Sequence, residues 1–260
     1  MQIHEALNIK DSPKVISLIG GGGKSTTMFS LAKECSKQGK KILVTTTTHI
    51  SLAQGNMAKK LIVEPQYNRA IHQLKNDYRE YPILCLTTIL LKDKGKLRGI
   101  PKSWIEKIKR ERIFNLILVE ADGAKEKPFK APAEHEPVLP KDSDMVIAVM
   151  GIEVLDKPIT SQYVHRPEKV LALLGKNKGN GKIYLTKENI PKIFFHREGI
   201  LKGVDKKKEV YILINKVDKK GEGKALELAN QLIEKSTIEN LKILIGQVQD
   251  LQRPIKFIIG

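Results

Sequence analysis

One short run of this 260-residue chain combines the residue types that bind phosphate: Gly20, Gly21, Gly22, Gly23, Lys24, Ser25 and Thr26. Glycines lose much conformational entropy on folding, so four in succession indicate that their bare backbone is needed. Backbone amides can surround an anion, and a following helix adds a partial positive charge. Lys24 would neutralise the β- and γ-phosphates of a nucleotide, and the Ser25 or Thr26 hydroxyl would bind Mg²⁺. The run therefore predicts a phosphate-binding loop.

The loop is shorter than the common P-loop pattern, which has a glycine five positions before the Gly-Lys pair. That position is Leu18, so the motif begins at Gly20 and is similar to the shortened loop of Mur-type ligases. A flexible turn capped by Ser25 is the alternative. Because an apolar strand at 15–19 precedes the loop and helical spacing begins at Lys24, we favour phosphate binding.

Carboxylates follow a second apolar strand at 116–119. Glu120, Asp122 and Gly123 come directly after it, where a nucleotide-binding protein places the carboxylate that supports Mg²⁺. We expect Glu120 and Asp122 at the metal, Asp122 also to orient water, and the Gly123 amide to meet the γ-phosphate. The alternative is a polar turn that closes the strand, since Asp-Gly pairs are common in turns.

Asn215, Lys216 and Asp218 form an Asn-Lys-x-Asp pattern directly after a strand at 209–214. In GTPases this pattern reads guanine, because a carboxylate accepts hydrogen bonds from N1–H and the 2-amino group, which adenine does not offer. An Asn/Asp turn that caps the helix beginning near Gly223 is the alternative. We favour a preference for guanine.

Four threonines at 45–48 end the strand that follows the first long helix. β-Branched residues favour strands in any case, and the alternation of a strand turns at most two of the four toward a ligand. We expect Thr46 to contact Mg²⁺ or the γ-phosphate, whereas His49 fits a site and the surface equally well.

The loop at 124–140 begins right after Gly123, so in a parallel sheet it leaves the edge where ligands bind. Its basic side chains include Lys130 and His135, which are candidates for charge neutralisation or proton transfer during turnover. The same residues could grip an anionic substrate or client instead. A solvated surface loop is the third interpretation, and the position of the loop favours a functional role.

Apolar strands alternate with helices along the chain, which is typical of an α/β fold with parallel strands. We expect a single three-layer domain over residues 1–260, with a mostly parallel sheet and an inserted subregion at about 51–112. We expect one helix that begins at Lys24 and further helices at 65–74, 103–112, 167–174 and 223–234. The expected strands are 15–19, a strand that starts at 42–44 and ends in 45–49, 83–91, 115–119, 145–150, 209–214 and 241–245. We expect 241–245 to be the last strand of the chain.

The composition argues against several classes of protein. A net charge of +17 comes mainly from dispersed lysines without interleaved aromatics, so we do not expect a nucleic-acid site. No apolar run approaches the length that crosses a bilayer, and the first residues lack the profile of a signal peptide. Cys35 and Cys85 cannot form a disulfide framework and suit a reducing interior. We expect a cytoplasmic protein without membrane contact.

Taken together, these segments resemble the YqeC family of proposed accessory proteins for selenium-dependent molybdenum hydroxylases. The resemblance covers nearly the whole chain, and its blocks are residues 16–27, 43–49, 119–125, 129–138, 164–167 and 213–218. It implies a P-loop NTPase-like fold, genes adjacent to those of selenium and molybdenum hydroxylases, and a role in maturing a labile selenium cofactor. Neither Cys35 nor Cys85 stands in a constellation suited to chalcogen transfer.

The favoured hypothesis is a Mg²⁺-dependent nucleotide-binding protein, an NTPase that prefers GTP over ATP and assists maturation of a selenium/molybdenum hydroxylase cofactor. Its partners would be the nucleotide and that hydroxylase or its cofactor. The shortened loop leaves a second hypothesis open, an ATP-dependent ligase or kinase acting on a small anionic substrate. A third is a nucleotide-gated binding module without useful turnover. The Asn-Lys-x-Asp pattern favours the first, and the absence of separate ligase domains weakens the second.

Overall fold

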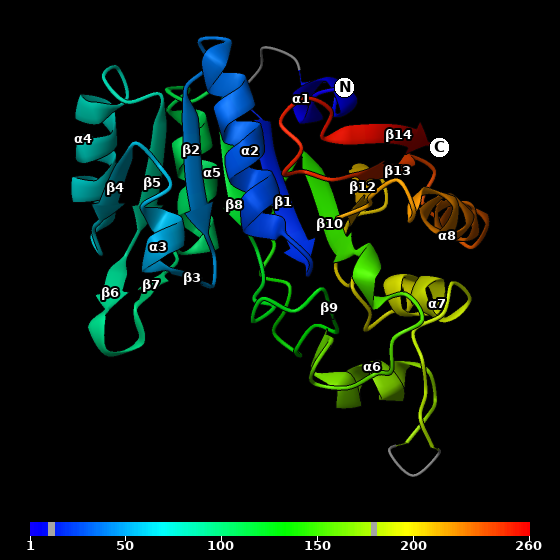
Figure 1. Cartoon of the computed structure of the whole chain (residues 1–260). Coiled ribbons are helices and arrows are strands. Elements are labelled where there is room, and N and C mark those ends of the chain that lie inside the picture. The colour runs from blue at the N-terminus through cyan, green and yellow to red at the C-terminus, as the bar shows by residue number, and fades with distance from the viewer. Residues whose placement is uncertain (10–13, 178–180) are drawn as a thin grey trace.

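A nine-stranded sheet runs through the centre of the molecule in the computed structural model, which describes residues 1–9, 14–177 and 181–260 (Figure 1). Its strand order is β14-β13-β12-β10-β1-β8-β2-β5-β4, and every neighbouring pair is parallel except β13 and β14. The strands are β1 Lys14–Gly20, β2 Ile42–Thr46, β4 Lys60–Val63, β5 Ile83–Thr87, β8 Leu116–Glu120, β10 Met145–Gly151, β12 Glu209–Asn215, β13 Leu241–Gly246 and β14 Ile255–Ile259.

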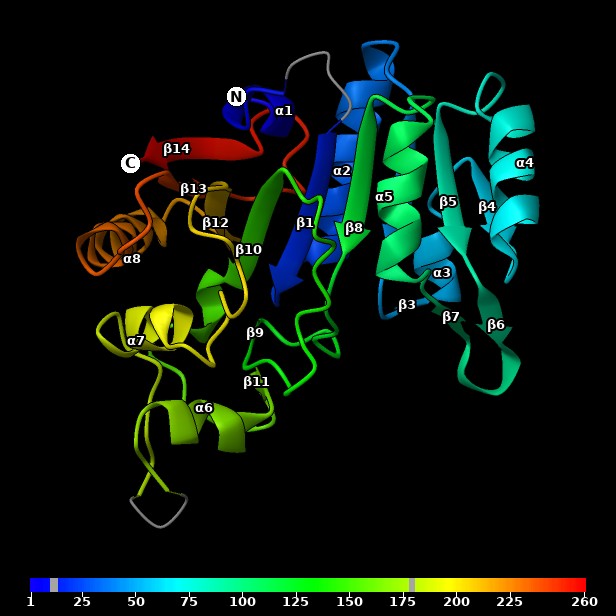
Figure 2. The ribbon, with the colours of Figure 1, turned by 180° about the vertical axis from the view of Figure 1, so that it is seen from behind.

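Helices cover both faces of this sheet, which confirms the three-layer α/β fold with a mostly parallel sheet. α1 and α2 pack on one face, and α4, α5 and α8 pack on the other; α2 is in front of the sheet in Figure 1 and α5 is in front in Figure 2. The helices are α1 Ile3–Ala6, α2 Lys24–Lys37, α3 Leu52–Gly55, α4 Tyr67–Asp77, α5 Lys102–Arg110, α6 Pro167–Leu173, α7 Asn189–Phe195 and α8 Glu222–Glu234.

The central strand β1 is apolar on both sides because both of its faces are buried. Ile16 and Leu18 pack beneath α2, whereas Val15 joins the cluster under α4 and α5 and Ile19 joins the cluster under α8. Burial of one such side chain contributes roughly 1.5–3 kcal/mol, so these layers hold β1, and the glycine loop that follows it, firmly in place.

Two small sheets lie below the carboxyl ends of the central strands in Figure 1. The first is antiparallel and has the order β3-β7-β6, with β3 at His49–Ser51, β6 at Ile89–Leu91 and β7 at Lys96–Arg98. The second pairs β9, Phe129–Lys130, with β11, Val164–His165. Both stand beside the edge at which the sequence places its polar motifs.

The single strand expected at 83–91 is wrong, because the chain leaves the main sheet at Thr88. The Thr88 hydroxyl donates to the carbonyls of Arg98 at 3.2 Å and Gly99 at 3.0 Å, and the chain then continues as β6 in the small sheet. Gly99 is required here, since a Cβ at this position would lie 2.1 Å from the Thr46 carbonyl oxygen. Contacts of Thr88 with residues ten and eleven positions further along therefore override the mostly apolar pattern of 83–91.

The expectation that 241–245 is the last strand is also wrong, since β14 follows and pairs antiparallel with β13.

Within 51–112, β4 and β5 belong to the main sheet, and a single domain with an insertion there stays a prediction. The run at 176–181, whose Gly and Asn content predicts a polar linker, lies partly outside the described residues. No helix in the described ranges has the length and apolarity needed to span a membrane.

Candidate phosphate-binding site

A cavity of about 1030 Å³ opens where β1, β2 and β8 end beside the first turn of α2. This is the edge at which ligands of open α/β sheets bind, and the volume is at the upper end of the roughly 300–1,000 Å³ of small-molecule sites. Its lining includes the segment 21–26, the small sheet β3-β7-β6 and the chain that follows β8, together with residues 47–48, 99–101, 165–166 and Lys216. The cavity can therefore hold a nucleotide and leave room beside it.

The glycine loop is shaped by close approach to neighbouring backbone. Gly20, Gly22 and Gly23 have φ of +92°, +75° and +121°, a region that favours glycine. A Cβ on Gly22 would lie 2.2 Å from the Gly151 amide nitrogen. The path of the chain by itself therefore requires glycine at these positions.

Most of these glycine amides are engaged within the protein. The Gly20 amide donates to Asp122 Oδ2 at 3.0 Å, that of Gly21 to the Val149 carbonyl at 2.8 Å, and that of Gly22 to the Lys127 carbonyl at 3.0 Å. The amides at 24–26 belong to the first turn of α2 and have no intrahelical acceptor. The first turn of the helix is thus the anion site that this geometry offers.

Lys24 is folded back onto its own loop and is almost completely buried. Its Nζ donates to the Gly20 carbonyl at 2.7 Å and lies 3.2 Å from Asp122 Oδ1 and 3.7 Å from Glu120 Oε1. Burial disfavours the charged form, but the two carboxylates outweigh it and raise the pKa of Lys24. The side chain is therefore charged and stands at the phosphate loop.

Ser25 and Glu120 form a short hydrogen bond that brings together the two oxygens expected at Mg²⁺. Ser25 Oγ donates to Glu120 Oε2 at 2.5 Å, and Gln54 Nε2 donates to the same hydroxyl at 2.7 Å. Burial raises the pKa of Glu120, an effect that Lys24 and the Ser25 hydroxyl partly offset. A cation beside this carboxylate would relieve its desolvation, so a hydroxyl and a carboxylate oxygen fit a magnesium ion.

The described residues contain no group of three or more His, Cys, Asp or Glu side chains that could hold a metal by themselves. Mg²⁺ is commonly held by one or two protein oxygens together with substrate phosphates and water. A magnesium ion at Ser25 and Glu120 would therefore depend on the nucleotide.

Asp122 connects the phosphate loop with a second, buried network of charges. Its Oδ2 lies 3.0 Å from Lys130 Nζ, and Lys130 in turn donates to Glu136 Oε2 and the Gly123 carbonyl, each at 2.7 Å. Arg166 Nη1 donates to the same oxygen of Glu136 at 2.8 Å. Positive and negative groups alternate from Lys24 to Arg166, so each buried charge has a partner of opposite sign.

The network gives the stability of the protein a dependence on pH. Burial opposes ionisation of Glu136, but Lys130, the Ala133 amide and Arg166 lower its pKa to about 2. A carboxyl with a depressed pKa stabilises the folded state above its unfolded pKa of about 4.3, and this contribution is lost as the pH falls toward 2. Glu136→Gln should be less stable than wild type at pH 7, and the gap should close by up to about 3 kcal/mol between pH 5 and pH 2.

Urea unfolding at stepped pH measures this gap. Glu134→Gln is the matched control, because Glu134 is exposed on the same loop, and it should follow wild type at every pH. A constant difference between Glu136→Gln and wild type over the whole range would contradict the role given to Glu136.

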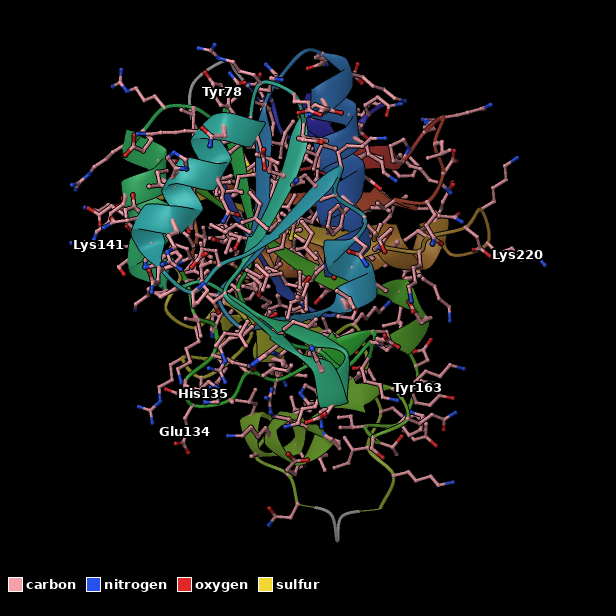
Figure 3. All side chains as sticks on the ribbon, turned by 90° about the vertical axis from the view of Figure 1, so that its left-hand side faces the viewer. Tyr78, Glu134, His135, Lys141, Tyr163 and Lys220 are labelled. Atoms are coloured by element: carbon pink, nitrogen blue, oxygen red, sulfur yellow. The ribbon has the colours of Figure 1, made fainter. Side chains whose placement is uncertain are left out.

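Lys130 and His135, the two residues expected to act in turnover, occupy different environments. Lys130 is fully buried and does not line the cavity, so its ammonium group positions Asp122 and Glu136 instead of facing a ligand. His135 is exposed, contributes to the rim of the cavity, and lies at the periphery of the molecule together with Glu134 (Figure 3). A catalytic part for His135 stays a prediction.

The three polar residues of the Asn-Lys-x-Asp segment make different contacts. Asn215 Nδ2 donates to the Gly22 carbonyl at 2.9 Å and its Oδ1 accepts from the Val248 amide at 3.0 Å, so it ties the phosphate loop to the chain after β13. Lys216 lines the cavity and pairs with Glu153. Asp218 forms the rest of the motif.

Asp218 is exposed and its Oδ1 accepts from the Gly221 amide at 2.8 Å, directly before α8. This is the turn-and-cap geometry of the alternative interpretation, and Asp218 is outside the lining of the cavity. The carboxylate keeps a second oxygen, so recognition of guanine stays a prediction.

The threonine segment lies at the cavity, but not through Thr46. The Thr46 hydroxyl is buried, donates to the Glu120 carbonyl at 2.7 Å and accepts from the Thr48 amide at 3.0 Å. Thr47, Thr48 and His49 line the cavity instead. Thr46 thus holds the end of β2 against β8, and its contact with a ligand stays a prediction.

Sequence reasoning missed Gln54, Glu136 and Arg166. Gln54 is the third residue of a capping box with Ser51, since the Gln54 amide donates to Ser51 Oγ at 3.1 Å and the Ser51 amide donates to Gln54 Oε1 at 2.7 Å. The spacing of Ser51 and Gln54, three residues apart, is a pattern from which the sequence predicts the start of a helix. The contact of Gln54 with Ser25 does not follow from that pattern, because it depends on how β2 and α3 pass the phosphate loop.

The strand, glycine loop and helix, with Glu120 at the end of the neighbouring strand, define a P-loop NTPase-like fold. The sequence pattern of the family described as YqeC protein matches residues 16–168, which is more than half of the chain. The protein belongs to the YqeC family. "Uncharacterized protein YqeC" of Escherichia coli (strain K12) is 34% identical over 160 residues, an alignment that covers 62% of this chain and 60% of the length of that relative.

Two solved structures have a similar arrangement at low sequence identity. The MinC:MinD cell division protein complex of Aquifex aeolicus matches with a TM-score of 0.48 and 14% identity, covering 91% of this chain and 82% of the other. Signal recognition particle 54 kDa protein from Aeropyrum pernix K1 in complex with GDP matches with a TM-score of 0.41 and 15% identity, covering 94% and 43%. These scores are too low to transfer a ligand or an activity.

Proposed function

We propose that the protein binds a nucleoside triphosphate with Mg²⁺ and hydrolyses it, with a preference for GTP. The observation that supports this proposal best is the convergence of Lys24, Ser25 and Glu120 at the first turn of α2, beside the cavity. A helix N-terminus and a lysine attract the phosphates, and a hydroxyl with a carboxylate suits the metal.

In this proposal Lys24 exchanges its contacts with Asp122 and Gly20 for the β- and γ-phosphates. Bound Mg²⁺ would neutralise developing charge on the phosphates, with Ser25 and Glu120 as the residues that hold it. Asp122 Oδ1 accepts no hydrogen bond from any described residue and faces Lys24, so it becomes available to orient a water once Lys24 has turned. Lys130 stays on Oδ2 and keeps the carboxylate in position.

The wider biological role that we propose for the protein is based on its membership of the YqeC family. We infer that turnover assists maturation of the cofactor of a selenium-dependent molybdenum hydroxylase, in the cytoplasm. Burial raises the pKa of both Cys35 and Cys85 to about 12, so neither thiol supplies a thiolate at neutral pH. Direct transfer of selenium through a cysteine of this chain is therefore not part of the proposal.

The base preference is tested by Asp218→Asn. An amide cannot accept both hydrogen bonds from guanine, so the variant should lose about 2–5 kcal/mol of GTP affinity while its ATP affinity stays constant. Competition between the two nucleotides for a fluorescent analogue measures both affinities. Asp205→Asn is the matched control, because Asp205 is also exposed and also accepts a backbone amide in a turn. Equal affinity of wild type for ATP and GTP would overturn the guanine preference.

An ATP-dependent ligase or kinase acting on a small anionic substrate is the second candidate. The observation that favours it is the extent of the cavity, which continues past the phosphate loop to the side chains of β3 and β7. Turnover that increases when a small anion is supplied would favour this candidate over simple hydrolysis.

A further inference from the structure

The small sheet β3-β7-β6 presents two rows of side chains toward the phosphate loop. Residues directly opposite one another across antiparallel strands share a face of the sheet. One row contains His49, Arg98 and Ile89, and the next contains Ser51, Lys96 and Leu91. All of these except Leu91 line the cavity. Ile50, which pairs with Leu97, also borders it, whereas Leu97 is buried outside the lining.

Positive charge dominates the lining as a whole, which holds seven lysine or arginine side chains and only three glutamates. Several of the seven already have partners: Lys24 pairs with Asp122, Arg166 with Glu136 and Lys216 with Glu153, and Lys127 donates to a backbone carbonyl. Lys96 and Arg98 have no hydrogen-bond or ion-pair partner for their side chains anywhere in the described ranges of the chain. Within the described ranges, unneutralised charge therefore remains on Lys96 and Arg98 of the sheet wall and on Lys125 of the chain that follows β8.

His49 lies among these charges on the same small sheet. Burial, Arg98 and Lys96 together lower the pKa of this imidazole, as expected where cations face one another without an anion between them. Ile89 stands opposite Arg98 and is 37% exposed, which adds an apolar contact next to the cations. The wall thus offers an oxyanion site with an apolar neighbour.

We propose that His49, Lys96 and Arg98 bind the oxyanion group, a phosphate or a carboxylate, of a second substrate that lies beside the nucleotide. The guanidinium of Arg98 can hold such a group with two parallel hydrogen bonds, and Lys96 adds a point charge. The inference rests on the proposed function, since it assigns the part of the cavity that a nucleotide on the phosphate loop leaves open. It identifies the second substrate as a small anion with an apolar part.

Binding of labelled inorganic phosphate and of labelled citrate to the full chain tests the proposal. Equilibrium dialysis is done with the phosphate loop saturated by Mg²⁺ and a non-hydrolysable GTP analogue, so that neither anion can occupy that loop. The two probes separate a phosphate site from a carboxylate site. The test variant is Lys96→Gln with Arg98→Gln. The control is Lys92→Gln with Lys102→Gln, which removes the same charge from exposed positions outside the cavity.

Wild type and the control should bind at least one of the two anions, and the test variant should bind it about tenfold more weakly or worse. The affinity of all three proteins for the GTP analogue, measured separately, should agree within about twofold, because the cations lie outside the phosphate loop. No binding of either anion by wild type, or equal binding by the test variant, would overturn the proposal. Wild type could fail to bind the nucleotide and still bind an anion more tightly than the Lys96→Gln, Arg98→Gln variant does. In that case the proposed function fails and the anion site stands.

Discussion

Lys24→Ala is expected to weaken binding of GTP by about 100-fold or more, because it removes a charged contact to the phosphates from a buried site. The fold should persist. Asp122 keeps Lys130 as a partner, and Glu120, whose pKa is raised by burial, can take up a proton when Lys24 is gone. Titration calorimetry with a non-hydrolysable analogue, together with thermal unfolding, measures both effects.

Lys33→Ala is the control for this experiment, since Lys33 lies on the exposed side of α2 and should change neither quantity. Lys24→Met retains the apolar stem and keeps the test decisive if the alanine variant unfolds. A folded Lys24→Met protein with wild-type affinity for the nucleotide would contradict the assignment of the phosphate loop.

Lys130→Met is expected to lower the free energy of unfolding by about 3–5 kcal/mol. Lys130 is fully buried and stands between the carboxylates of Asp122 and Glu136, so the substitution leaves two buried charges without their common partner. Urea unfolding at pH 7 measures the loss. The variant should also bind nucleotide more weakly, because Asp122 loses the contact that fixes its position.

Lys141→Met provides the matched comparison for Lys130→Met. Lys141 is exposed and lies at the surface in Figure 3, so its replacement should change the free energy of unfolding by less than about 0.5 kcal/mol. Similar stabilities of the two variants would show that the buried network does not support the fold.

The parts of the fold around the candidate site that the sequence predicts correctly are those encoded locally. A strand, glycines and a lysine at the start of a helix specify one another within a dozen residues, and Glu120 and Asp122 follow an apolar strand that could only lie in the sheet. The closeness of the glycine loop to Glu120 and Asp122 then follows from the parallel arrangement, because the carboxyl ends of such strands share an edge of the sheet.

The parts that the sequence does not predict depend on tertiary contacts that the local pattern does not show. Lys130 stands in a polar segment that looks like a solvated loop, and only the fold shows that Asp122, Glu136 and the Gly123 carbonyl surround its ammonium group. The break of the strand at Thr88 likewise needs the carbonyl of Arg98, ten residues further along the chain. Local pattern cannot report either partner, because each is brought into place by strands that pair elsewhere.

Calorimetric titration of the wild-type protein with a non-hydrolysable GTP analogue, with and without Mg²⁺, tests the central claim most directly. The geometry of Lys24, Ser25 and Glu120 predicts one binding site per chain, with an affinity that falls when Mg²⁺ is removed. Absence of binding of both GTP and ATP analogues to folded protein, with Mg²⁺ present at millimolar nucleotide, would contradict it.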